Sequence, residues 1–306
     1  MKKYISLSLC LFSLSSFAEL KLALNWKPEP QFGGFYTAQK FGFFKKQNLE
    51  VKILEGGSGT PTTQMLAAGQ VDYAIVSADE IVLAHDRGAN DIVAIFATYQ
   101  TNPQGIMTHA EKKFEKLEEL FQSEGVLLWQ SGLPYAQFIQ KKYGPLKLKT
   151  APYTGGIGNF QHDPQISQQC FVTSEPLSAE KAGLKVKTFL VAESGYNPYT
   201  TVVAVKASRL KEKPEEVKRM VQALREAWGE YLKNPKLTNQ LMASLNKAMD
   251  METFQKSAEA QLPLIQVKGV PLGQMTADRW KSLVDQLLDL KLIKSKPAVE
   301  SLFTSL

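Results

Sequence analysis

The sequence has little cysteine and little histidine, and it lacks the common short motifs of enzyme active sites. Its 306 residues include 2 cysteines and 3 histidines. His85, His109 and His162 do not show the i, i+4 spacing of metal ligands on a helix, and no cysteine pair accompanies them. GxSxG, Walker and dinucleotide-binding motifs are absent. We therefore predict no catalytic residue, no metal and no cofactor.

The chain also lacks a basic surface pattern and a long apolar run. The formal net charge is +6, but acidic residues are interspersed among the basic ones, and no basic stripe contains regularly spaced aromatic residues. This distribution argues against a nucleic-acid partner. No stretch reaches the 18 or so apolar residues of a membrane-spanning helix. With 44% hydrophobic and 22% charged residues, the composition is that of a soluble globular protein large enough for two domains.

The first 18 residues have the pattern of a secretory signal peptide. Two lysines are followed by the apolar segment 5–14 and by the small-x-small sequence Ser16-Phe17-Ala18. We predict cleavage after Ala18 and export to the periplasm, which would lower the net charge from +6 to +4 by removing two lysines. A lipid-attachment role for Cys10 has little support, because Leu9 stands where a small residue would be expected.

Removal of Cys10 would leave Cys170 as a single cysteine, so no disulfide could form within the chain. A nucleophilic Cys170 would need a neighbouring base, and His162 is the nearest histidine in the sequence. The alternative, which we favour, is a buried thiol beside Phe171.

The segment from Leu22 to Gly57 predicts a strand, a loop, a helix and a second strand. Leu20, Leu22 and Leu24 alternate as in a strand, which ends at the Asn25–Pro28 loop. Gly33-Gly34 precedes a helix ending near Lys40, and 51–54 forms the next strand. Such a βαβ unit places a binding crevice at the carboxyl ends of its strands.

The remaining pattern predicts an α/β fold. Buried strands at 71–76 and 92–99 alternate with helices, which favours a parallel sheet covered by helices. A second set of strands follows at 125–129, 169–173 and 186–191, and strand 201–205 returns to the first unit. Helices are expected at 215–233, 237–249, 251–262 and 277–290. Trp228 and Trp280 follow the helical period of their apolar neighbours, so both should be core residues.

These elements predict two α/β lobes joined by two crossings. The first lobe comprises residues 19–104 and 205–306, and the second is the insertion 105–204. The crossings, near 104–108 and 200–206, would form a hinge that lets the lobes close around a ligand.

Several polar or aromatic side chains follow predicted strands and are therefore expected at the crevice. Ser77 and Glu80 come after the strand 71–76, although Glu80 alternatively stabilises the N-terminus of its own helix. Gln100 and Asn102 follow the next strand, and Trp129 ends a strand of the second lobe.

Three further residues have equally open roles. Tyr36, at the start of the helix after Gly33-Gly34, either meets the ligand or is a core residue. Tyr196 and Asn197, at the return crossing, either contact the ligand or only shape the hinge.

Three segments resemble the periplasmic substrate-binding proteins of ABC importers: LNWKPEPQFGGFYTAQKFGFFKKQNLEVKI, GQVDYAIVSADE and VTSEPLSAEKAG. The nearest branch includes binders of thiamine-pyrimidine precursors, binders of sulfonates and a fungal pyrimidine synthase. The resemblance implies a type II periplasmic-binding-protein fold that clamps a small ligand between two lobes. It also implies an inner-membrane ABC permease as partner, and we expect the binding protein itself to be a monomer.

The resemblance also implies roles for three residues. Asn25 and Trp26 occupy the position where the family has Asn or Asp before a tryptophan that stacks on a flat heteroaromatic ring. The alternative for Trp26 is packing against Phe32 or Phe35. Glu175 occupies the family's x-E-P position, where a carboxylate accepts hydrogen bonds from an amino-substituted ring. Its alternative is a cap on the helix that starts at Pro176.

The sequence departs from its pyrimidine-handling relatives in two places. Phe32 stands where those relatives usually have histidine, and NPYTTV at 197–202 replaces the cysteine-rich stretch of the fungal enzyme. The second departure, together with the export signal, argues against synthase chemistry, whereas the first argues against a pyrimidine ligand. We expect a non-catalytic protein that captures a small planar heteroaromatic ligand, a thiamine-pyrimidine precursor or a related vitamin-like compound. The alternatives are a pyrimidine-synthase-like enzyme and a sensor that reports to a membrane receptor.

Overall fold

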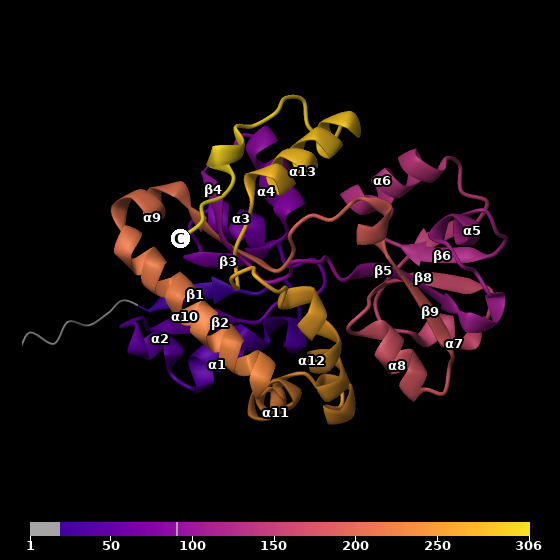
Figure 1. Cartoon of the computed structure of the whole chain (residues 1–306), viewed down its shortest axis with the longest axis horizontal. Helices are drawn as coiled ribbons and strands as arrows, with labels where there is room; N and C mark the ends of the chain where they lie inside the picture. Colours follow the sequence, from indigo (N-terminus) through magenta and orange to yellow (C-terminus); the bar gives the residue numbers. More distant parts are fainter. Residues whose placement is uncertain (1–18, 90) are drawn as a thin grey trace, which may run out of the picture.

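Two mixed sheets, each flanked by helices, form the two halves of the molecule (Figure 1). The computed structural model describes residues 19–89 and 91–306. The predicted signal peptide, residues 1–18, lies outside the described residues. Within the described part of the chain, no helix combines the length and apolar character needed to cross a bilayer.

The first sheet has the strand order β2-β1-β3-β10-β4. Its strands are β1 (Leu20–Ala23), β2 (Val51–Leu54), β3 (Tyr73–Val76), β4 (Ile92–Ala97) and β10 (Val202–Lys206). β1 pairs in parallel with β2 and β3, as the alternation of strands and helices predicts. The sheet is mixed and not wholly parallel, because β10, whose direction the sequence did not predict, lies antiparallel between β3 and β4. This strand enters the sheet from the second half of the molecule, so no crossover helix sets its direction.

The second sheet has the strand order β7-β6-β8-β5-β9. Its strands are β5 (Gln104–His109), β6 (Val126–Trp129), β7 (Lys149–Pro152), β8 (Ile166–Phe171) and β9 (Val186–Leu190). β5 is antiparallel to both of its neighbours, whereas β6 is parallel to β7 and β8. The sequence patterns did not predict β5 or β7. β7 is mostly exposed, so it lacks a hydrophobic period.

Most helices follow the predicted spans. The first sheet is accompanied by α1 (Gly33–Lys40), α2 (Phe43–Lys46), α3 (Thr62–Ala67), α4 (Ala78–Asp86), α9 (Ala207–Glu212), α10 (Pro214–Lys233), α11 (Lys236–Leu245), α12 (Met251–Ile265) and α13 (Ala277–Asp289). The second is accompanied by α5 (Leu117–Phe121), α6 (Pro134–Tyr143), α7 (Gly158–His162) and α8 (Glu175–Lys181). Trp228 and Trp280 are fully buried, as the helical period predicts.

The Gly33-Gly34 pair allows α10 to pack directly on α1. A β-carbon on Gly33 would lie 2.0 Å from the Tyr231 ring, and one on Gly34 would lie 2.3 Å from the Trp228 ring. Phe35 meets Trp228 edge to face at 5.7 Å between ring centroids. Any larger residue at these two positions would separate the helices, so the glycines are required by packing.

The chain crosses between the halves twice, through 98–103 after β4 and through 191–201 after β9. The predicted crossings lay slightly further along the chain: Gln104 is the first residue of β5, and 202–206 form β10. The predicted lobe boundary at 104/105 thus falls at the start of β5, and the boundary at 204/205 falls inside β10.

Arg279 of α13 joins the two crossings. Its guanidinium donates to the backbone oxygen of Gln100 at 2.5 Å and to the backbone oxygen of Asn197 at 2.7 Å. It also donates to Asn197 Oδ1 at 2.9 Å and stacks on the Tyr199 ring at 3.8 Å from the centroid. One side chain therefore fixes both connections relative to the C-terminal helix.

Outer helices of the two halves are also linked by ion pairs. Lys181 at the end of α8 lies 2.6 Å from Asp250, the residue before α12. Lys141 of α6 lies 2.5 Å from Asp289 of α13. All four side chains are substantially exposed, and they lie at the surface.

Replacing Arg279 with alanine should lower the free energy of unfolding by about 2–4 kcal/mol, because the Gln100 and Asn197 oxygens would lose a charged donor. Urea unfolding followed by tryptophan fluorescence measures the loss. Lys281→Ala on the same helix is the matched control, because Lys281 is exposed. It should change stability by less than about 0.5 kcal/mol. Equal losses of unfolding free energy in the two variants would contradict the role of Arg279 in holding the two crossings.

Candidate ligand-binding site

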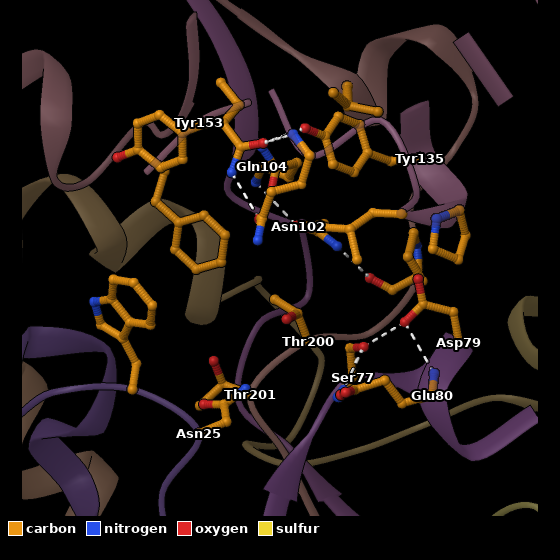
Figure 2. Close-up of a pocket in the computed structure, with 18 of the residues that line it drawn as sticks. Asn25, Ser77, Asp79, Glu80, Asn102, Gln104, Tyr135, Tyr153, Thr200 and Thr201 are labelled. Atoms are coloured by element: carbon orange, nitrogen blue, oxygen red, sulfur yellow. Dashed lines mark hydrogen bonds between the residues drawn. The ribbon is translucent and has the colours of Figure 1, made fainter. Parts of the chain in front are cut away.

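A cavity of about 550 Å³ lies between the two halves, where the strand ends of both sheets and the two crossings meet. Figure 2 shows Tyr153, Gln104 and Tyr135 on one side and Asn25, Ser77 and Glu80 on the other. A volume of this size suits a small organic molecule, and its position between two lobes is common for ligand sites.

Asn25 and Trp26 reach the cavity from the loop after β1. Gly56 packs beneath this loop: its N–H donates to the Trp26 carbonyl at 3.1 Å, and a β-carbon there would lie 2.1 Å from the Leu24 oxygen. The Trp26 indole N–H donates to Glu29 Oε1 at 3.1 Å. Trp26 is partly exposed, so its ring is held in place while still reaching the cavity.

Ser77, Asp79 and Glu80 form a second group at the start of α4. The Ser77 N–H donates to Glu80 Oε2 at 2.8 Å, so Glu80 stabilises the start of its own helix while also lining the cavity. The Ser77 hydroxyl donates to Asp79. Tyr196 from the second crossing donates to Asp79 Oδ2 at 3.1 Å. Burial raises the pKa of Asp79, an effect that these hydrogen bonds oppose.

Glu175 begins α8 on the opposite side of the cavity. Tyr153 donates its hydroxyl to Glu175 Oε1 at 2.6 Å, and the Phe171 N–H donates to Oε2 at 2.8 Å. Burial raises the pKa of Glu175. The carboxylate is therefore fixed by two donors at a helix N-terminus and also faces the cavity, so its two expected roles are compatible.

A glutamine cluster lines the second half of the cavity. Gln169 Oε1 accepts hydrogen bonds from the Gln130 N–H at 2.6 Å and from the Tyr135 hydroxyl at 2.7 Å. Gln169 Nε2 donates to Gln130 Oε1 at 3.0 Å. This network fixes polar groups of β8 and α6 around the cavity.

Cys170 also lines the cavity, but it does not have the character of a nucleophile. It is a buried free cysteine, and burial raises its thiol pKa well above the ordinary value. His162 does not line the cavity. His85 and His109 are buried, and each has Nε2 within hydrogen-bonding distance of a backbone oxygen, that of Ile92 at 2.8 Å and that of Phe160 at 3.0 Å.

Seven of the eleven residues predicted at the site line the cavity. They are Asn25, Trp26, Ser77, Glu80, Asn102, Glu175 and Tyr196. The structure places the other four, Tyr36, Gln100, Trp129 and Asn197, outside the lining.

Two of these four are core residues. Tyr36 is 2% exposed and belongs to the hydrophobic core of the first half, in line with the core alternative. Trp129 is 1% exposed and meets the Tyr135 ring edge to face at 6.2 Å. Its side chain belongs to a hydrophobic cluster with Phe121 and Tyr135 and does not face the cavity.

The other two serve the crossings. Gln100 donates to the Gln274 backbone oxygen at 3.0 Å. Asn197 Oδ1 accepts from the Asn102 N–H at 2.9 Å and from Arg279. Asn197 therefore shapes the hinge, one of its two expected roles.

The lining residues with polar groups that the sequence analysis did not identify include Glu29, Asp79, Gln104, Gln130, Tyr135, Tyr153 and Gln169. Glu29 lies between two prolines in the Trp26 loop, which was a usable signal. Tyr153 follows the unpredicted β7. Gln104 and Gln169 lie within strands of the second sheet, where sequence alone does not show which face lines a cavity.

A family model described as NMT1/THI5 like matches residues 29–137 and 158–238. The chain belongs to the NMT1/THI5-like family. This finding confirms the resemblance drawn from the three sequence segments.

Individual relatives are more distant. The formylaminopyrimidine-binding protein of Halalkalibacterium halodurans is 20% identical over 302 residues, which cover 94% of this chain and 90% of that protein. A 4-amino-5-hydroxymethyl-2-methylpyrimidine phosphate synthase of Saccharomyces cerevisiae is 25% identical over 176 residues. That match covers 57% of this chain and 44% of the synthase, so the chain spans less than half of the synthase's length.

The solved periplasmic aliphatic sulphonate binding protein SsuA from Escherichia coli superimposes with a TM-score of 0.74 at 12% identity. The match covers 94% of this chain and 93% of SsuA. This NMT1/THI5-like chain therefore has the type II periplasmic-binding-protein fold that its sequence implied.

The pKa of Glu29 makes the stability of the protein depend on pH. Burial raises it from 4.5 to about 7, and the Glu175 charge adds to the rise, whereas the Trp26 hydrogen bond and Lys27 oppose it. Such a carboxyl group favours folding while it is protonated. Its contribution is complete below the unfolded pKa of 4.5 and is lost as pH rises through about 7.

Glu29→Gln should therefore melt higher than the wild type by roughly 2–4 °C at about pH 8, because the amide carries no charge to bury. The difference should shrink towards about pH 5, where Glu29 is protonated in the folded protein. Differential scanning calorimetry across this range measures it. Glu50→Gln, at an exposed residue, is the control and should track the wild type. A Glu29→Gln variant that melts with the wild type at every pH would contradict the buried carboxyl.

Proposed function

We propose that this protein is an extracytoplasmic solute-binding protein that captures a small planar heteroaromatic ligand between its lobes and delivers it to an ABC permease. The observation that carries the proposal is the cavity between the two halves, with a positioned indole on one side and a fixed carboxylate on the other. An aromatic face binds a flat π-system, and a carboxylate accepts hydrogen bonds from ring amino groups.

The proposed residues divide the work between the lobes, taken as 19–104 with 205–306 and as 105–204. Asn25 and Trp26 bind the ring from the first lobe, together with Ser77 and Glu80. Glu175 binds its amino groups from the second lobe. Asn102 and Tyr196 contact it from the crossings. All seven lie on the cavity surface. Binding to both lobes at once would favour their closed arrangement, which the permease would recognise.

A pyrimidine precursor is the specific ligand that we propose. The formylaminopyrimidine-binding protein of H. halodurans aligns along nearly all of this chain and supports a pyrimidine. We propose a periplasmic location after export, like that of the periplasmic aliphatic sulphonate binding protein SsuA from E. coli.

The synthase-like alternative has less support from the residues at the site. The segment NPYTTV at 197–202 stands where the fungal enzyme has its cysteine-rich stretch. Among the described residues, no histidine lines the cavity, and the Cys170 thiol is held in its protonated form by burial. The site therefore supplies hydrogen-bonding groups and an aromatic surface, which suit binding.

Thermal unfolding with 4-amino-5-hydroxymethyl-2-methylpyrimidine tests the proposal. The compound should raise the Tm of the wild type by several degrees when present at about 100 times its Kd, because it binds only the folded state. Trp26→Ala should lose most of this shift and keep the circular dichroism of the wild type, because Trp26 lies on a loop.

Phe41→Ala is the control for loss of an aromatic residue elsewhere, because Phe41 is 40% exposed and does not line the cavity. It should keep the full shift. A Trp26→Ala variant that is stabilised as much as the wild type would remove the indole from the site. Mass spectrometry of small molecules that copurify with the protein identifies the natural ligand.

A further inference from the structure

The charges around the cavity differ in sign from the charge of the whole chain. The sequence has a formal net charge of +6. The lining nevertheless contains four carboxylates, from Glu29, Asp79, Glu80 and Glu175, against the single cation of Arg87. Arg87 at the end of α4 and Glu80 in its first turn are both exposed residues, so water screens both charges, whereas Glu29, Asp79 and Glu175 are buried or half-buried.

None of the four carboxylates is neutralised by a basic side chain. Across residues 19–89 and 91–306, no lysine or arginine nitrogen lies within 4.0 Å of any of them. Their hydrogen-bond donors are neutral: an indole, a serine, two tyrosines and backbone N–H groups. Burial raises the pKa of all four, and at Glu29 the charge of Lys27 only partly opposes that rise.

Glu29 and Glu175 are a pair of acids from different halves that interact, whereas Asp79 and Glu80 interact within one half. Glu29 belongs to the first half and Glu175 to the second, and each lines the cavity. The Glu175 charge contributes to the raised pKa of Glu29, so the two carboxylates repel each other across the space that the ligand would occupy. Glu29 Oε1 already accepts from Trp26, and its Oε2 accepts no hydrogen bond from the described residues.

We infer that Glu29 and Glu175 select an organic cation, bound between the two carboxylates and against the Trp26 ring. A positive nitrogen there would attract both the Glu29 and the Glu175 carboxylate and so offset their mutual repulsion. It would also donate a hydrogen bond to Glu29 Oε2. An indole beside it adds a cation–π attraction. Anionic groups such as phosphate or sulfonate would face four acids against the one lining cation, Arg87, so they are disfavoured.

This inference rests on the proposed function, because it concerns the ligand of the same cavity. Among planar heteroaromatic ligands, the inference favours those with a positive charge. The preferred members carry an ammonium group, a protonated ring or a quaternary nitrogen.

Three pyrimidines that share one ring and differ in charge test the inference. They are 4-amino-5-aminomethyl-2-methylpyrimidine, its hydroxymethyl counterpart and the phosphate ester of the latter. Isothermal titration calorimetry at about pH 8, above the pKa of Glu29, should rank them in that order, with the ammonium compound about tenfold tighter than the alcohol. The phosphate ester should bind weakest.

Glu29→Gln should weaken binding of the ammonium compound about tenfold and leave the alcohol within about twofold. Glu175→Gln should weaken both compounds, because Glu175 also accepts from the ring amino group, and it should weaken the ammonium compound more than the alcohol. Both changes keep the side-chain shape and one acceptor oxygen. Glu50→Gln removes an exposed acid outside the cavity, and it should leave all three affinities unchanged. An alcohol or a phosphate ester that binds most tightly would overturn the inference while the proposed function stands.

Failure of all three pyrimidines to bind would overturn the pyrimidine as ligand. The charge inference is then decided by thermal shift with a library of small aromatic cations, neutral compounds and anions. Cations should predominate among the compounds that raise the Tm, and their effect should be smaller in Glu29→Gln. Predominance of neutral compounds or anions would overturn the inference. A library in which no compound raises the Tm would overturn both proposals.

Discussion

The structure depends on the return of the chain into its first sheet. β10 enters between β3 and β4 and completes that sheet with residues that follow the whole second half in sequence. The first half is therefore complete only after the chain has passed through the whole second half. The crossings 98–103 and 191–201 are brought together at one point, where Arg279 donates to a residue of each. The cavity lies at this junction because the loops after β1 and β3 end beside the same two segments.

The cavity combines burial with unbalanced negative charge, two features that proteins seldom keep together without a use. Four carboxylates lie around one space and receive hydrogen bonds only from neutral donors. Replacing them by apolar groups would be less costly for an empty site. The rise of the Glu29 pKa to about 7 is a measure of that cost. A site with this composition is better suited to a cationic guest than to an anion.

Local patterns in the sequence predicted the helices and the buried strands of the first half well. They failed where the deciding contact lies far along the chain. The antiparallel direction of β10 depends on entry from the second half. The packing of α1 depends on α10, nearly two hundred residues later, which reaches α1 only because Gly33 and Gly34 lack side chains. The loop residues Asn25 and Trp26 were recognisable by resemblance, whereas Gln169 in β8 carries no local signal of its orientation.

The ion pairs between the outer helices have a consequence for how firmly the halves hold together. Lys181–Asp250 and Lys141–Asp289 are exposed pairs, and exposed pairs contribute little because water and salt screen them. Parting the helices would return these charges to solvent at small cost. The free energy that holds the halves around a ligand must then come from contacts in the cavity. The outer ion pairs add only a small attraction between the halves, and it weakens as ionic strength rises.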